Sequence, residues 1–235
     1  MNKATIECPF ELVAIDLDGT LVDSVGDLHM AVSSMLNSMA LQPASVEEVR
    51  KWVGSGVERL VHRALTRCMD TDAEQLQLKC ALGLFQETYQ SVNGQQSRLY
   101  PDVAQGLEWL STLSTPMVLV TNKAARFAYP LVESLKIDHF FDFCIAGDEV
   151  ATKKPDPAAL LQAASRCQSN PRRCVLIGDS ISDIKAARAA YFSSISVSYG
   201  YNHGESVRLL QGILKSDAII DSFSELPAVF KHMSM

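Results

Sequence analysis

Two aspartates stand two positions apart at the end of a short apolar run near the N-terminus. The run FELVAIDL at 10–17 is typical of a buried strand, and it leads through Asp16 and Asp18 into Gly19. Side chains at positions i and i+2 of an extended strand point the same way, so both carboxylates can reach one ligand. Gly19 allows a sharp turn after them. Taken alone, this motif fits an Asx turn that closes the strand equally well.

A second acidic motif follows the apolar run CVLIG at 174–178 and contains Asp179 and Asp183. Open parallel sheets bind ligands at the carboxyl ends of their strands. If the two strands are neighbours, as many as four carboxylates crowd one site, and they cannot all stay ionised unless a cation joins them. Because all candidate ligands are hard oxygens, the pattern points to Mg²⁺. Asp183 alone would fit an acidic residue at a helix start.

Two further motifs carry groups suited to a phosphate beside such a cation. Thr121, Asn122 and Lys123 end another apolar run and offer a hydroxyl, an amide and backbone N–H donors. The sequence KKPDP at 153–157 places a lysine before a rigid turn that opens a helix, so its positive charge is held near a fixed position. A surface lysine pair ahead of a capped helix is the alternative for this last motif.

Short apolar runs alternate with helix-like segments over most of the chain. Continuous apolarity without alternation fits strands that are covered on both faces. Strands that alternate with helices imply parallel crossovers, so we expect an α/β fold with a doubly wound parallel sheet. The expected strands lie at 10–17, 117–121, 141–146, 174–178, 193–199 and 218–220, and the expected helices at 102–113, 157–168, 182–190 and 205–214.

A long insertion separates the first two expected strands, which lie much further apart than the roughly 30 residues of a strand-helix-strand unit. Segment 24–95 carries apolar residues at helical spacing throughout. Within it, Ser45 and Glu48 have the spacing of a capping box. We therefore predict a helical cap domain at 23–96, inserted into an α/β core made of 1–22 and 97–235.

Composition excludes several classes of partner. The 235 residues have a net charge of −6 and no basic run, which disfavours nucleic acid and anionic membrane surfaces. The apolar runs fall well short of the roughly 20 residues of a membrane span, and the first residues lack the apolar segment of an export signal. We expect a cytoplasmic protein that binds a small molecule. The six cysteines and five histidines lack the spacing of a zinc or redox site.

Read in chain order, the motifs DLDGT, TN, KP and GDSxxD resemble those of the haloacid dehalogenase superfamily. The resemblance covers about 10–24 and 98–221, and the helical insertion matches the small cap that this family places after its first motif. It implies a Rossmann-like core and a phosphoryl transfer that depends on Mg²⁺ and passes through an aspartyl-phosphate. The expected substrate is a small phosphate monoester.

The resemblance also implies roles for individual residues. Asp16 matches the nucleophile of the family, and Asp18 matches the acid that protonates the leaving alcohol and then activates water. Thr121 and Lys154 match the pair that steadies the transferring phosphate oxygens, with Asn122 beside them as a substrate-binding residue. The implied Mg²⁺ ligands are the side chains of Asp16 and Asp179 and the backbone carbonyl of Asp18, with Asp183 in support.

A glycine-containing loop in the expected cap precedes an amphipathic helix. Successive N–H groups of Gly54, Ser55 and Gly56 could bind an anion at the start of that helix, although a plain turn between helices fits as well. With YPDV and KKPDPAALLQAA further on, this segment resembles the phosphoglycolate phosphatases of the superfamily. The resemblance implies that the loop and Arg59 meet the carboxylate of 2-phosphoglycolate. Arg59 fits a solvated helix face equally well.

Other activities stay open at this point. A sugar-phosphate mutase of the same superfamily is the first alternative, and a non-catalytic binding protein on the same scaffold is the second. In the family, members that cleave carbon–halogen bonds carry no acid at the position of Asp18, so its presence favours phosphoryl transfer. The chain is expected to be a monomer or a homodimer.

Overall fold

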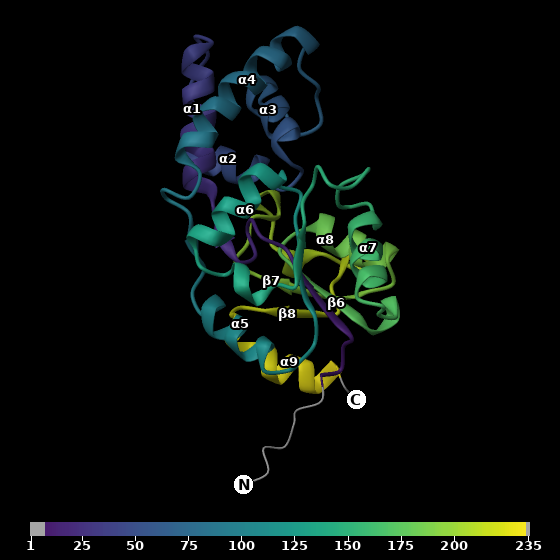
Figure 1. Ribbon diagram of the computed structural model, residues 1–235. Coiled ribbons are helices and arrows are strands. Elements are labelled where there is room, and N and C mark those ends of the chain that lie inside the picture. The colour runs from purple at the N-terminus through teal and green to yellow at the C-terminus, as the bar shows by residue number, and fades with distance from the viewer. Residues whose placement is uncertain (1–7, 234–235) are drawn as a thin grey trace.

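A six-stranded parallel sheet forms the centre of the molecule in the computed structural model, which describes residues 8–233 (Figure 1). The strands are β1 (Leu12–Ile15), β4 (Met117–Val120), β5 (Phe143–Ile145), β6 (Cys174–Gly178), β7 (Ser193–Val197) and β8 (Ala218–Ile220). Their order is β5-β4-β1-β6-β7-β8, so β1 pairs with β4 on one side and with β6 on the other. Such a reversal of strand order opens a crevice at the carboxyl ends of the central strands.

Helices cover both faces of this sheet. Val13 and Ile15 of β1 pack toward one face, which is covered by α5 (Val103–Ser111), α6 (Ala125–Ser134) and α9 (Leu226–Met233). Leu12 and Ala14 pack toward the opposite face, which is covered by α7 (Ala158–Arg166) and α8 (Ile181–Ala189). Burial on both faces explains why the strands read as continuous apolar runs.

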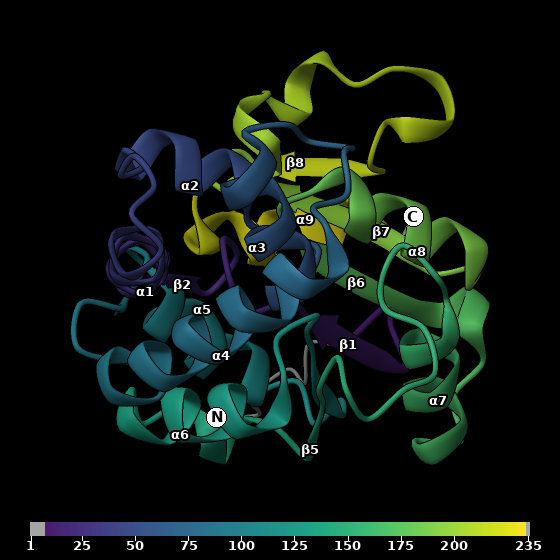
Figure 2. The ribbon, with the colours of Figure 1, turned by 90° about the horizontal axis from the view of Figure 1, so that it is seen from above.

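Four further helices lie above the carboxyl ends of the sheet (Figures 1 and 2). They are α1 (Val25–Ser38), α2 (Val46–Trp52), α3 (Val57–Thr66) and α4 (Gln75–Val92). We call these four helices and their connections the cap. Their apolar faces form a cluster of their own, which Phe127 and Tyr201 join from the core. The chain leaves and re-enters the core through the short antiparallel strands β2 (Val22–Asp23) and β3 (Arg98–Leu99).

Most of the expected elements are confirmed. All six predicted strands, the helices at α5, α7 and α8, and the capping box of Ser45 and Glu48 are present. The segment 24–95 is helical, with breaks between its four helices. The helices α6 and α9 were not foreseen. The division into two domains at 22/23 and 96/97 stays a prediction.

The predicted helix at 205–214 is wrong. Two separate 3₁₀ turns, at Val207–Leu209 and Gly212–Leu214, occupy this region, and a third, at Asn202–Gly204, directly precedes it. Gly204 and Gly212 have φ angles of 85° and 58°, which a continuing right-handed helix does not contain. The side chain of Ser206 also accepts a hydrogen bond from the backbone N–H of Arg208, which starts a new turn there.

Two features bear on partners and metals. Between residues 8 and 233, no helix combines the length and the apolarity needed to cross a bilayer. The six cysteines are free thiols.

Asp27 ties the cap to the segment that returns to the core. This buried side chain of α1 accepts hydrogen bonds from the backbone N–H groups of Gly94, Gln96 and Ser97 at 2.8, 2.7 and 3.1 Å, and from the hydroxyl of Ser97. A carboxylate is suited to this place because it accepts at every lone pair.

We predict that Asp27→Asn lowers the free energy of unfolding by about 2–4 kcal/mol, because an amide brings donor hydrogens to a site that supplies only donors. Urea unfolding measures this change. The exposed Asp70 serves as a control, and Asp70→Asn is expected to change the same quantity by about 0.5 kcal/mol or less. Equal effects of the two substitutions would contradict the role given to Asp27.

Candidate active site

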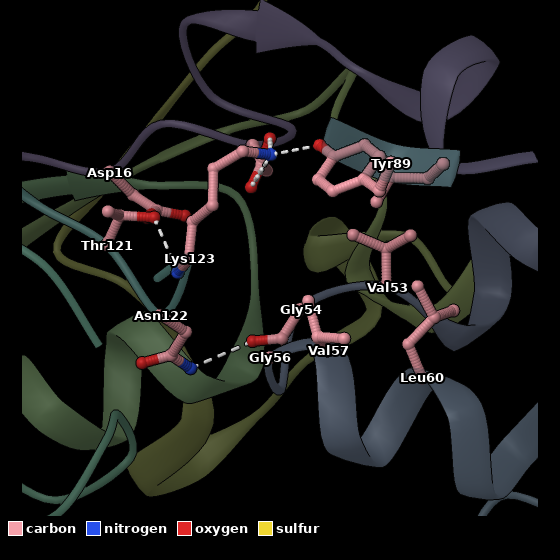
Figure 3. Close-up of a pocket in the computed structure, with 12 residues that line it drawn as sticks. Asp16, Val53, Gly54, Gly56, Val57, Leu60, Tyr89, Thr121, Asn122 and Lys123 are labelled. Atoms are coloured by element: carbon pink, nitrogen blue, oxygen red, sulfur yellow. Dashed lines mark hydrogen bonds and ion pairs between the residues drawn. The ribbon is translucent and has the colours of Figure 1, made fainter. Parts of the chain in front are cut away.

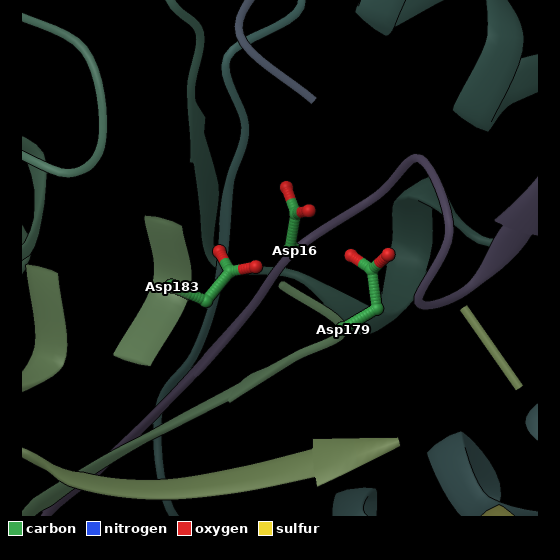
Figure 4. A group of neighbouring side chains, drawn as sticks. All are labelled: Asp16, Asp179 and Asp183. Atoms are coloured by element: carbon green, nitrogen blue, oxygen red, sulfur yellow. The ribbon is translucent and has the colours of Figure 1, made fainter. Parts of the chain in front are cut away.

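Three buried carboxylates converge at the carboxyl ends of β1 and β6. Because these two strands are neighbours, Asp16 and Asp179, which directly follow them, lie side by side. Asp183 joins them from the first turn of α8. One oxygen of each carboxylate lies within 4.8 Å of one oxygen of each of the others (Figure 4). Four carboxylates were expected at one point, and the structure gathers these three there.

Lys154 is the cation that faces this group. Its Nζ lies 2.7 Å from Oδ1 of Asp16 and 2.7 Å from Oδ1 of Asp183, and it donates a hydrogen bond to the carbonyl of Val120 at 2.9 Å. Burial raises the pKa of Asp16 to about 7, against the opposing effect of Lys154. Burial and the nearby Asp183 and Asp16 raise the pKa of Asp179 well above its usual value. One ammonium group therefore faces three carboxylates, so the cluster has an excess of negative charge when all three are ionised, and burial opposes this state by raising the pKa values of Asp16 and Asp179.

The donor set fits Mg²⁺. All three carboxylates offer hard oxygen ligands, and a divalent cation would neutralise the charge that they carry when ionised. The backbone around Asp179 is packed closely, because a Cβ atom on Gly19 or Gly200 would lie 2.4 or 2.1 Å from atoms of its side chain. The backbone N–H of Tyr201 also donates to Oδ2 of Asp179 at 2.7 Å. This packing fixes the carboxylate in place.

Asp18 stands apart from these three acids. Its two oxygens lie 3.0 and 3.1 Å from Nζ of Lys123, and Oδ1 also accepts a hydrogen bond from the hydroxyl of Ser24. The Lys123 side chain is buried, whereas that of Asp18 is 14% exposed. The sequence motif had suggested only backbone contacts to phosphate at this position, so the lysine side chain is a functional candidate that sequence reasoning missed.

The residues after β4 differ in what they leave free for a ligand. The hydroxyl oxygen of Thr121 accepts a hydrogen bond from the backbone N–H of Lys123 at 3.1 Å, so its own proton can be donated to a phosphate oxygen. The Asn122 amide is engaged within the protein. Its oxygen accepts from the N–H of Lys154 and its nitrogen donates to the carbonyl of Lys154, each at 2.9 Å. Its nitrogen also donates to the carbonyl of Gly54 at 2.9 Å (Figure 3). Asn122 therefore holds the turn at Lys154 and the cap loop in place, and its role as a substrate-binding residue stays a prediction.

A cavity lies between these residues and the cap (Figure 3). Its volume is about 40 Å³. Core residues supply its polar wall and cap residues most of its apolar wall. Its lining consists of Asp16, Asp18, Leu28, Val53, Gly54, Gly56, Val57, Leu60, Tyr89, Thr121, Asn122 and Lys123.

The predicted cap residues are only partly at this cavity. Gly54 and Gly56 line it, but Ser55 and Arg59 do not. The Arg59 guanidinium contacts Asp72 at 2.5 Å and the carbonyl of Met69 at 2.8 Å. The Arg59 side chain is 25% exposed and paired with Asp72, and its contact with the substrate stays a prediction. The helix α3 turns this side chain toward the loop that leads to α4.

A segment after β7 connects the acidic cluster to the cap, and no motif pointed to it. The hydroxyl of Tyr201 accepts hydrogen bonds from the N–H groups of Ser24 and Val25 at 2.8 and 3.1 Å, and donates to Asp23 at 2.8 Å. His203 contacts the carbonyl of Lys51 in α2 at 2.9 Å. Tyr201, whose backbone N–H donates to Asp179, thus also caps the start of α1 with its hydroxyl.

Comparison with known proteins agrees with this geometry. Residues 13–197 match the haloacid dehalogenase-like hydrolases. The chain belongs to this family. A phosphoglycolate phosphatase from Nitrosococcus oceani is 45% identical to it over 216 residues, which cover 92% of this chain and 94% of that protein. A phosphoglycolate phosphatase from Pseudomonas putida is 43% identical over 197 residues, covering 83% and 72% of the two chains.

A solved structure shows the same architecture. The crystal structure of a predicted phosphoglycolate phosphatase from Haemophilus somnus superposes with a TM-score of 0.86 at 30% identity, covering 94% of this chain and 98% of that one. The α/β sheet with its helical insertion is therefore the fold of this hydrolase and of that structure alike.

We predict that Mg²⁺ binds more tightly as pH rises from about 6 to about 8, because the cation must displace a proton from Asp16, whose pKa burial raises to about 7. The same shift makes the metal-free protein less stable as pH rises from about 4 to about 7, since the native state holds this proton more tightly than the unfolded chain. Calorimetric titration with Mg²⁺ in buffers of different ionisation enthalpy measures the released proton. An affinity independent of pH would contradict the prediction, and Asp16→Asn should weaken the dependence.

Proposed function

We propose that this hydrolase is a Mg²⁺-dependent phosphatase that cleaves a small phosphate monoester, with 2-phosphoglycolate as the expected substrate. The observation that carries the proposal is the shared cavity of Asp16 and Asp18, which two buried lysines flank beneath the cap. The relatives named phosphoglycolate phosphatase support this choice of substrate.

In the first step, a carboxylate oxygen of Asp16 attacks phosphorus and forms an aspartyl-phosphate. The bond between phosphorus and the ester oxygen breaks, and Asp18 gives its proton to the departing alkoxide, which leaves as an alcohol. Such a proton transfer contributes about 10²–10⁴-fold to the rate. A covalent intermediate divides one difficult hydrolysis into two easier steps.

In the second step, the carboxylate of Asp18 takes a proton from water. The resulting hydroxide attacks phosphorus, inorganic phosphate leaves, and the carboxylate of Asp16 is regenerated. Lys154, between Asp16 and Asp183, and the hydroxyl of Thr121 stabilise the negative charge of the transferring oxygens. Asp16, Asp179 and the backbone carbonyl of Asp18, with support from Asp183, would hold Mg²⁺, which would neutralise further negative charge.

The cavity favours a short leaving group. Val53, Val57 and Leu60 of the cap form an apolar wall of this small cavity beside Asp16 and Asp18. Gly54 and Gly56 of the cap loop also line the cavity, ahead of the first turn of α3, where backbone N–H groups suit an anion. A carboxylate on a two-carbon alcohol suits these surroundings.

We predict that Asp16→Asn lowers kcat with 2-phosphoglycolate by at least about 10⁴-fold, because an amide cannot form the aspartyl-phosphate. The protein should stay folded, since the change removes one of three crowded charges. Phosphate release and thermal unfolding measure the two effects. Asp70→Asn is the control with full activity, and near-normal turnover by Asp16→Asn would show that another group is the nucleophile.

A panel of phosphate monoesters tests the proposed reaction itself. With Mg²⁺ present, we expect 2-phosphoglycolate to give the highest kcat/KM, with glucose 1-phosphate well below it, and chelation by EDTA to stop turnover reversibly. Conversion of glucose 1-phosphate to its 6-phosphate without phosphate release would identify a mutase instead. No turnover of any monoester with Mg²⁺ would overturn the proposed function.

A further inference from the structure

Lys123 is a buried lysine that the reaction described above does not use. Its side chain is 3% exposed and lies at the junction of the core and the cap. Among the described residues that line the cavity, it is the one with a positively charged side chain. Lys154, the other lysine of the site, is committed to Asp16 and Asp183. Each lysine is therefore paired with a different acid of the first motif, Lys123 with Asp18 and Lys154 with Asp16.

The contacts of Lys123 define its orientation completely. The ammonium group lies 3.0 and 3.1 Å from the two oxygens of Asp18, and it donates to the hydroxyl of Tyr89 at 2.6 Å. An ammonium has three donor hydrogens, so these contacts use its capacity. Burying a charge is costly unless it is paired, which favours keeping this arrangement intact.

The backbone that carries Lys123 is also fixed. Its N–H donates to the hydroxyl of Thr121, and its carbonyl accepts from the N–H of Gly147 at 2.9 Å. A Cβ atom on Gly147 would lie 2.3 Å from the carbonyl oxygen of Asn122, so only glycine lets the two loops approach this closely. The lysine thus extends from a rigid turn.

Tyr89 brings the cap into the same network. It lies on α4, and its buried ring packs against Phe85 and Phe127 with centroid distances of 5.3 and 4.7 Å. Phe127 belongs to α6 of the core, so the tyrosine sits where the two parts of the molecule meet. Its hydroxyl reaches Lys123 only while α4 stays in this position (Figure 3).

We propose that Lys123 is a positioning residue for Asp18, and that Tyr89 makes this positioning depend on the cap. The ammonium group contacts both oxygens of Asp18 and holds the carboxyl group at the wall of the cavity. There the leaving oxygen of the substrate must receive its proton. The hydroxyl of Tyr89 holds the ammonium group in place while α4 is docked. This inference rests on the proposed phosphatase reaction and assigns a role in its proton transfer.

The leaving group provides a test that a general structural defect does not imitate. An alkyl phosphate releases a strongly basic alkoxide, which requires the proton of Asp18, whereas 4-nitrophenyl phosphate releases a weakly basic phenolate, which departs without it. A residue that positions Asp18 should therefore matter for the first substrate and much less for the second. A residue that supports the phosphate site or the fold should affect both equally.

The experiment compares Lys123→Met with the wild type on 2-phosphoglycolate, or on the best alkyl phosphate of the panel, and on 4-nitrophenyl phosphate. We expect kcat to fall by about 10²–10³-fold with the alkyl phosphate and by less than about tenfold with 4-nitrophenyl phosphate. The affinity for inorganic phosphate with Mg²⁺, measured by calorimetry, should change by less than about threefold. The exposed lysine of α4 supplies the control, since Lys79→Met should leave both substrates unaffected.

A second variant tests the contribution of the cap and avoids a possible folding defect of the first. Tyr89→Phe keeps the packed ring and removes only the hydroxyl. We expect kcat to fall by about 3–10-fold with the alkyl phosphate alone, and no additional loss when the change is combined with Lys123→Met. Tyr191→Phe, at an exposed tyrosine, is the matched control.

The outcomes separate the two proposals. If the wild type hydrolyses both substrates but Lys123→Met loses both by the same factor, or neither, the positioning role is overturned while the phosphatase function stands. If Tyr89→Phe and Lys123→Met act independently, the link to the cap is overturned. If the wild type hydrolyses no phosphate monoester, the proposed function fails and the inference fails with it.

Discussion

Repulsion between like charges is the constraint on which the rest of this structure depends. Pairing of β1 with β6 brings Asp16 and Asp179 to adjacent strand ends, and Asp183 comes within 4.8 Å of both. Buried carboxylates at this separation remain charged only beside cations. The protein supplies one, Lys154, and under the proposed function a divalent ion neutralises the charge that remains. Glycines at 19 and 200, where a side chain would collide with Asp179, are further consequences of this crowding.

The cap is tied to this charged centre by polar contacts as well as by apolar packing. Asn122 joins the Lys154 turn to the carbonyl of Gly54, and Tyr201 joins Asp179 to the first turn of α1. Asn122 and Tyr201 each bind a loop of the active site through one polar group and the cap, or the start of α1, through another. The arrangement of the acids and the position of the cap are therefore coupled, which suits a reaction that must exclude water while the phosphoryl group is transferred.

Such a site lowers the stability of the folded protein. Buried ion pairs stabilise a fold less than apolar side chains of the same volume, and three carboxylates around one lysine are worse than a matched pair. The surrounding structure offsets this cost with apolar burial on both faces of the sheet and a separate apolar cluster in the cap. The proposed reaction accounts for these charges, since a carboxylate can attack a phosphate dianion only where cations neutralise both.

Local patterns in the sequence were sufficient for the strands, for most core helices and for the acids at the strand ends, because periodicity and spacing along the chain determine which backbone segments extend and where side chains leave them. The region 205–214 misled this reasoning because its apolar residues have helical spacing, while Gly204 and Gly212 bend the backbone away from a helix. The tertiary structure alone decided the directions of the long side chains. Lys123 turns to Asp18 and Tyr89, Arg59 turns to Asp72, and Tyr201 reaches the start of α1. A flexible side chain takes the direction in which its charge or hydroxyl finds a partner, and these partners come close only when distant segments have packed together.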